Sequence, residues 1–169
     1  MYSILVVGAG KEGKGFIGET FSTDGWKVSF LDKDPRVTEA LKQGSYIVNA
    51  HQENGDFTRV IRDYDVYLAD EKYDCMKAII ECDVIALALY PEDIPEAAAY
   101  LGKGLSARVR SGGKKLTIMS CTNKNHLMPE IERAFLEALE NAEARDWFRE
   151  NVALRDAIIR RSCRADAVY

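Results

Sequence analysis

Three glycines give the clearest indication of a binding function in this sequence. Gly8, Gly10 and Gly13 are spaced as G-x-G-x-x-G. In this pattern the first glycine permits a tight turn, the second lets the backbone approach a pyrophosphate, and the third lets a helix pack closely on a strand. The helix that follows presents free backbone N–H groups and a positive dipole end to phosphate. The spacing therefore predicts a site for a dinucleotide.

An acidic residue ends the second expected strand at the distance that such a site needs. Asp32 lies 24 residues after Gly8 and 19 residues after Gly13. A carboxylate there accepts hydrogen bonds from the adenosine ribose hydroxyls and repels a 2′-phosphate, which favours NAD over NADP. Lys33 follows directly and leaves room for some NADP binding. The alternative interpretation is a glycine-rich turn that binds no ligand, beside a surface aspartate.

Polar residues in the second half of the chain are weaker candidates. Asn123 follows an expected strand and its amide suits a nicotinamide ribose or carboxamide, although asparagine is also a common helix cap. His126 has the chemistry of a general base, but its place at the start of a helical segment equally suits a surface or capping residue. Four arginines near the carboxyl terminus suit a phosphate group, a solvated face or contact with an absent partner: Arg155, Arg160, Arg161 and Arg164.

Short apolar segments alternate with longer amphipathic segments, which indicates strands followed by helices. We expect strands at residues 2–7, 26–31, 83–89, 116–121 and 152–159. We expect helices at residues 14–23, 35–42, 71–81, 91–105 and 130–149, the last of them with a break near Ala142. The basic segment 108–115, which contains Gly112 and Gly113, is expected to be an exposed loop.

Residues 45–68 interrupt this alternation. Residues 45–50 and 57–68 have strand character with no long helix between them, and Asn54-Gly55 is a typical hairpin turn. Antiparallel strands are therefore expected here, beside a mostly parallel sheet with helices on both faces. The prediction is an α/β, Rossmann-like, doubly wound fold, in which ligands bind beyond the carboxyl ends of the strands.

The composition indicates one globular domain of 169 residues, 47% of them hydrophobic. A net charge of −4 gives no overall attraction to nucleic acid or anionic lipid, so neither is expected as a partner. No apolar run approaches the roughly 20 residues of a membrane span. The four cysteines form no C-x-x-C pair and the two histidines lack metal-ligand spacing, so we expect reduced thiols, no metal and a cytoplasmic location.

The glycine-rich motif extends further than a dinucleotide fingerprint. Residues 8–18 have the sequence G-A-G-K-E-G-K-G-F-I-G, whose second half resembles the mannitol dehydrogenase and mannitol-1-phosphate 5-dehydrogenase family. The resemblance continues at residues 83–91, 116–123 and 151–161, so it covers most of the chain. This longer motif is far more specific than G-x-G-x-x-G alone.

Members of that family have a Rossmann-type cofactor domain and a mostly helical second domain, which carries a catalytic lysine in a K-x4-N-x2-H motif. That motif is absent from these 169 residues. The resemblance therefore implies that residues 1–169 are a single dinucleotide-binding domain with no catalytic residue of its own. The helical substrate domain of the family would be missing from this chain.

Two positions depart from the family pattern. Thr122-Asn123 stands where the family often has Glu-Asn, and Ile159-Arg160-Arg161 stands where it usually has Val-Asp-Arg. The second departure replaces an acid with a base near the expected active site. It leaves the substrate, and activity itself, open.

The resemblance implies an NAD-binding domain whose full-length enzyme transfers hydride between a polyol or polyol phosphate and nicotinamide. Cofactor contacts are expected at Gly8, Ala9, Gly10, Gly13, Phe16, Ile17, Asp32 and Asn123. One alternative is a non-catalytic module that senses NAD(H) or ATP, because modules that gate potassium transport also place Asp-Lys-Asp-Pro after the second strand, as at residues 32–35. Another is a small reductase that completes its site by dimerising.

Overall fold

The computed structural model describes residues 1–121, 127–157 and 163. Its main sheet has six strands in the order β5-β2-β1-β6-β7-β8, and every neighbouring pair is parallel. These strands are β1 (Ser3–Val7), β2 (Lys27–Asp32), β5 (Asp65–Leu68), β6 (Val84–Leu87), β7 (Leu116–Ser120) and β8 (Val152–Asp156). When the separate β3–β4 hairpin is left aside, this is the 3-2-1-4-5-6 order of a Rossmann sheet, so the expected fold is confirmed.

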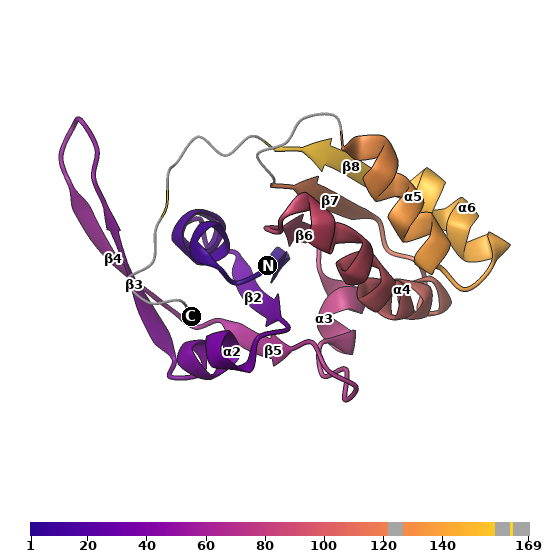
Figure 1. Ribbon diagram of the computed structural model, residues 1–169, viewed down its shortest axis with the longest axis horizontal. Coiled ribbons are helices and arrows are strands. Elements are labelled where there is room, and N and C mark those ends of the chain that lie inside the picture. Colours follow the sequence, from indigo (N-terminus) through magenta and orange to yellow (C-terminus); the bar gives the residue numbers. More distant parts are fainter. Residues whose placement is uncertain (122–126, 158–162, 164–169) are drawn as a thin grey trace.

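The central strands are buried because helices cover both faces of the sheet, as Figure 1 shows. One face carries the helix after β1 and helix α2; the other face carries α3, α4, α5 and α6. The helix after β1 has a π-helical part, η1 (Gly13–Gly18), that continues into α1 (Glu19–Thr23). The other helices are α2 (Pro35–Leu41), α3 (Met76–Glu81), a 3₁₀ turn η2 (Pro91–Asp93), α4 (Ile94–Arg110), α5 (Met128–Ala138) and α6 (Ala142–Asn151).

The hairpin of β3 (Ser45–Ala50) and β4 (Phe57–Arg62) forms its own two-stranded antiparallel sheet and projects from the body of the domain (Figure 1). The single strand expected at residues 57–68 is wrong, because Asp63 adopts a left-handed backbone with φ of 64° and separates β4 from β5. The hairpin is anchored on the helix after β1. The Tyr46 hydroxyl donates to the Lys14 carbonyl at 2.9 Å, and the Arg59 guanidinium lies 2.9 Å from the buried Glu19 carboxylate.

Other element boundaries also differ from expectation. Helix α3 begins only at Met76, because the segment before it turns at Tyr73, whose φ is 54°. The expected break near Ala142 is confirmed: the long helical stretch is two helices, and Asn141 caps the second by accepting from the Ala144 N–H at 2.9 Å. Strand β8 ends at Asp156, and the last residues of the expected strand lie outside the described residues.

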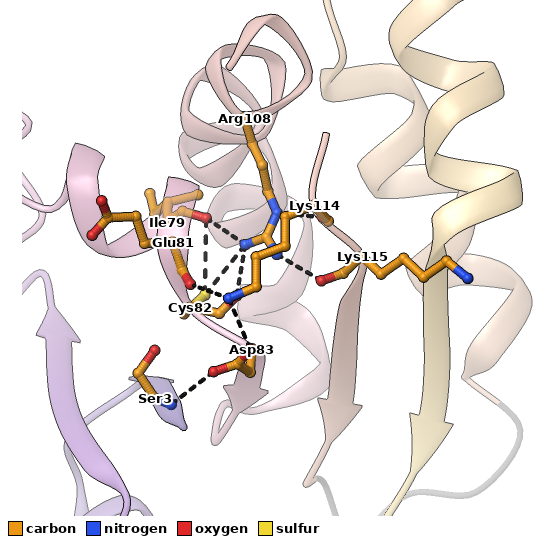
Figure 2. Close-up of polar contacts among 8 residues, drawn as sticks. All are labelled: Ser3, Ile79, Glu81, Cys82, Asp83, Arg108, Lys114 and Lys115. Atoms are coloured by element: carbon orange, nitrogen blue, oxygen red, sulfur yellow. Dashed lines mark hydrogen bonds and ion pairs between the residues drawn. The ribbon is translucent and has the colours of Figure 1, made fainter. Parts of the chain in front are cut away.

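The expected exposed loop at residues 108–115 is wrong at its first three residues, because α4 continues to Arg110. Arg108 lies in the last turns of α4 and is only 1% exposed. Figure 2 shows its guanidinium donating to the backbone carbonyls of Ile79, Cys82, Lys114 and Lys115, at 2.7–2.9 Å. A buried guanidinium is tolerated where hydrogen bonds satisfy its donors, so Arg108 joins α3, α4 and β7 from within.

A second set of polar contacts continues this cluster at the amino ends of β1 and β6. Asp83 accepts a 2.9 Å hydrogen bond from the Ser3 N–H and forms a 2.9 Å ion pair with Lys114 (Figure 2). Lys114 also donates to the Glu81 carbonyl at 3.0 Å. The cluster lies at the edge of the sheet opposite the glycine-rich loop, so it contributes to stability rather than to ligand binding.

Candidate functional site

The glycine-rich loop lies at the carboxyl ends of the strands, next to β1, where the strand order reverses. β1 is flanked by β2 on one side and β6 on the other, and the connections from these strands run to opposite faces. The Gly8 N–H donates to the Leu31 carbonyl at 2.9 Å, and the Ala88 N–H donates to the Val7 carbonyl at 2.8 Å. The loop is thus held against β2 and β6 at the point where Rossmann folds bind their ligands.

The three glycines occupy different surroundings. Gly8 has φ of 96°, and a Cβ there would lie 2.4 Å from the Ala88 carbonyl oxygen. A Cβ at Gly13 would lie 2.1 Å from the Gly8 carbonyl oxygen. By contrast, a Cβ at the exposed Gly10 would meet no atom within 4 Å. Packing of the chain on itself therefore requires two of the glycines, whereas Gly10 borders open space into which a ligand can approach.

Asp32 ends β2 with its side chain turned toward the loop. One carboxylate oxygen accepts from the Ala9 N–H at 2.8 Å and the other accepts from the Asp34 N–H at 2.9 Å. Each carboxylate oxygen can accept more than one hydrogen bond, so both retain capacity for a ribose hydroxyl. Ala9 itself is wholly buried and its N–H is already used, so its part is to hold the loop onto Asp32.

Lys14 is a residue of this corner that sequence reasoning did not single out. It follows Gly13 in the helix and is half-buried. Burial lowers the pKa of its ammonium, and the nearby Asp32 charge acts in the opposite direction. Its place inside the G-K-G-F-I-G motif was the available signal, but the sequence does not show that the side chain is partly desolvated.

Two cations that follow Asp32 closely in the sequence are paired with carboxylates. Lys33 lies 3.3 Å from Glu96 on α4, and Arg36 lies 2.9 Å from Asp34. The Asp34 pair also lowers the pKa of that carboxyl, chiefly through the hydrogen bonds from Arg36. Glu96 is another residue that sequence reasoning missed, because it lies 63 residues from Lys33.

The remaining expected site residues have different surroundings. Ile17 is 1% exposed and packs in the core cluster that includes Ala9 and Cys121, so it supports the loop from below. Phe16 is half-buried at the edge of that cluster. Asn123 and His126 lie outside the described residues, as do three of the four clustered arginines: Arg160, Arg161 and Arg164.

Cys121, directly after β7, does not have a reactive thiol. Burial, and to a lesser degree the Asp156 carboxylate, raises the pKa of the Cys121 thiol to about 11. A thiol with such a pKa stays protonated at neutral pH and is a poor nucleophile. Within residues 1–121, 127–157 and 163, no group of three or more histidine, cysteine, aspartate or glutamate side chains is placed to hold a metal ion, and no helix is long and apolar enough to cross a bilayer.

The sheet order and the glycine-rich loop at the reversal point define a domain of the Rossmann class. The comparison with known proteins identifies the branch: the Mannitol dehydrogenase Rossmann domain matches residues 2–165. The chain belongs to this family, as its G-K-G-F-I-G motif indicated.

This chain matches only part of the length of its relatives in this family. The mannitol-1-phosphate 5-dehydrogenase of Lacticaseibacillus paracasei is 28% identical over 144 residues, which is 84% of this chain and 38% of that protein. The mannitol-1-phosphate 5-dehydrogenase of Streptococcus pneumoniae is 30% identical over 118 residues, 69% of this chain and 31% of that protein. The chain therefore spans about a third of the length of these relatives.

Solved structures with the same fold include a dehydrogenase and a reductase. Octopine dehydrogenase in a complex with NADH and L-arginine superposes with a TM-score of 0.60 at 17% identity, covering 91% of this chain and 34% of that one. A protein described as a 2-dehydropantoate 2-reductase from Enterococcus faecalis gives a TM-score of 0.56 at 15% identity, covering 91% and 40%. At these identities the likeness extends to the fold alone.

Proposed function

We propose that this chain is the nicotinamide-dinucleotide-binding domain of a polyol or polyol-phosphate dehydrogenase. The observation that carries the proposal is the open space at Gly10, beside a loop that Gly8 and Gly13 hold in place at the sheet reversal. A pyrophosphate is the group that this arrangement suits, because in Rossmann folds the second glycine lets the backbone approach a pyrophosphate and the start of the following helix attracts it. Family membership supports a nicotinamide dinucleotide as the ligand.

We propose NAD rather than NADP as the preferred cofactor. Asp32 would accept hydrogen bonds from the ribose hydroxyls while it holds the loop through Ala9. A 2′-phosphate would bring negative charge next to this carboxylate. The two cations that follow Asp32 most closely in the sequence, Lys33 and Arg36, are already paired with Glu96 and Asp34.

In the full-length protein the proposed reaction is hydride transfer between a sugar alcohol, or its phosphate, and the nicotinamide. The cofactor supplies the redox chemistry, while the residues of this chain bind it, orient it and exclude water. The catalytic base and the substrate pocket would come from a second domain, because the match covers only 38% and 31% of the two relatives. A reducing, cytoplasmic setting is consistent with the buried thiols of Cys75, Cys82 and Cys121, which form no disulfide.

Titration calorimetry of the 169-residue chain with NAD, NADH and NADP under identical conditions tests this proposal. We expect NAD and NADH to bind more tightly than NADP. Gly10→Val should abolish binding without changing the thermal unfolding midpoint, since the new side chain would occupy only the ligand space. Absence of binding to all three dinucleotides would overturn the assignment.

A further inference from the structure

The helix behind the glycine-rich loop is intrinsically weak. Its π-helical part, η1, has three glycines in six residues, namely Gly13, Gly15 and Gly18. Glycine is unfavourable in a helix interior because it loses the most backbone freedom on folding. The π-helical form is itself rare, and it occurs frequently at functional sites. Contacts from outside the helix must therefore help to hold it in place.

The β3–β4 hairpin supplies such a contact through Tyr46. The phenol ring packs against Phe30 of β2, with the ring centroids 6.1 Å apart, and the hydroxyl donates to the Lys14 carbonyl at 2.9 Å. Gly18 makes this approach possible, because a Cβ there would lie 2.4 Å from the Tyr46 hydroxyl oxygen. Burial raises the pKa of this hydroxyl, so it stays protonated at neutral pH and remains a donor. The last glycine of the G-K-G-F-I-G motif is therefore required by the hairpin.

The backbone of Lys14 connects this contact to the ligand side of the loop. Its N–H donates to the Gly10 carbonyl at 3.0 Å, while its own carbonyl accepts from the Tyr46 hydroxyl. Gly10 borders the open space in which a pyrophosphate would lie. The hairpin is thus two hydrogen bonds away from the residue that the ligand would approach.

The hairpin has a second contact with the same helix, at the start of α1. The Arg59 guanidinium of β4 lies 2.9 Å from the Glu19 carboxylate, and Glu19 is only 4% exposed. The hairpin therefore stays attached when the Tyr46 hydroxyl alone is removed. A single substitution can for this reason separate the hydroxyl from the rest of the hairpin.

We propose that Tyr46 is a positioning residue of the dinucleotide site, whose hydroxyl holds Lys14, and through it the Gly10 peptide, in the conformation that binds the pyrophosphate. The inference rests on the proposed function and gives the hairpin a part in it. Without this hydrogen bond the loop would adopt other conformations for part of the time. The apparent affinity would then fall by the same factor as the fraction of chains competent to bind. A hydroxyl with a merely structural role would change stability alone.

The experiment compares the wild-type chain with Tyr46→Phe and Tyr64→Phe by calorimetry with NADH and with ADP. Tyr64 is a matched control: its ring lies 5.4 Å from Phe30, and its hydroxyl donates at 2.8 Å to the Leu41 carbonyl, at the end of α2. Each substitution keeps the ring and deletes one half-buried hydrogen bond to a backbone carbonyl. Thermal unfolding measures the loss of stability in each variant. Amide hydrogen exchange of the Lys14 N–H, followed by NMR, reports on the loop directly.

Both variants should lower the unfolding midpoint by a similar amount, about 2–4 °C. Only Tyr46→Phe should weaken NADH and ADP binding, by about threefold to tenfold, which is the range for one lost hydrogen bond. Only this variant should also speed exchange of the Lys14 N–H. Unchanged affinity or unchanged exchange in Tyr46→Phe, or equal weakening in both variants, would overturn the inference while leaving the proposed function in place. A wild-type chain that binds neither NADH nor ADP would overturn the proposed function, and the inference with it.

Discussion

The carboxylate of Asp32 accepts a hydrogen bond from the backbone N–H of Ala9, at 2.8 Å. This contact joins the end of β2 to the loop after β1, across 23 residues of sequence. The residue that would select the cofactor therefore also shapes the loop that would hold it. Binding and local stability should for this reason change together when Asp32 is replaced.

Replacing Asp32 with alanine should affect both properties. The N–H groups of Ala9 and Asp34 would lose their acceptor, so we expect the free energy of unfolding to fall by about 1–3 kcal/mol. The preference for NAD over NADP should also weaken, because the negative charge beside the ribose is gone. Urea unfolding and calorimetry measure the two effects.

Two further variants make the selectivity result specific. Asp65→Ala removes the same charge at the amino end of β5 and should leave the NAD preference unchanged. The double variant Asp32→Ala/Glu96→Gln also releases Lys33 from its ion pair and should bind NADP more tightly than Asp32→Ala alone. If the ratio of NAD affinity to NADP affinity is unaltered in both Asp32 variants, Asp32 is not the residue that determines cofactor selectivity.

Gly10 and Gly13 should respond differently to a single added methyl group. Gly13→Ala places a Cβ 2.1 Å from the Gly8 carbonyl oxygen, so we expect a loss of at least about 2 kcal/mol in unfolding free energy. Gly10→Ala meets open space and should change stability by less than about 0.5 kcal/mol. Urea unfolding of both variants decides this, and equal losses would mean that the loop is packed differently.

Arg108 should be among the most sensitive positions for stability. Arg108→Met removes the donors to four backbone carbonyls, two of them in buried hydrogen bonds, which should cost about 3 kcal/mol or more. Arg110→Met, two residues along α4, removes an exposed ion pair with Glu140 and should cost less than about 1 kcal/mol. A small effect at Arg108 in urea unfolding would show that water replaces the guanidinium.

Acid should act on stability partly through Asp83. Burial alone would raise the pKa of this carboxyl, but the Lys114 ion pair and the Ser3 N–H outweigh burial and hold the pKa below the ordinary value of 3.8. A carboxyl group whose pKa is lower in the folded state stabilises the protein at pH values above its unfolded-state pKa. This contribution is lost as the pH falls through its folded-state pKa.

The variant Asp83→Asn tests this pH dependence. It should be less stable than the wild type at neutral pH, and the difference should shrink as the pH falls below about 3.8. Lys114→Met should shift the loss of stability to higher pH, because it removes a main cause of the lowered pKa. Urea unfolding across this pH range provides the measurement, and a pH-independent difference would contradict the assignment.

The sequence by itself determined the fold class and the position of the candidate site. The glycine spacing, the apolar strand before it and the acidic end of the next strand lie within 32 contiguous residues, so local chemistry is sufficient to predict them. The hairpin turn at Asn54-Gly55 and the helix break near Ala142 were predictable for the same reason.

Only the tertiary structure decided what the charged residues do. Arg108 begins a basic segment whose composition is typical of an exposed loop. Its burial depends on carbonyls at the carboxyl end of α3 and just before β7, which accept hydrogen bonds from its guanidinium. The pairing of Lys33 with Glu96 and the partial burial of Lys14 likewise depend on segments brought together by folding. The energy of a charge is set by its neighbours and its solvation, and neither is contained in the residues beside it in sequence.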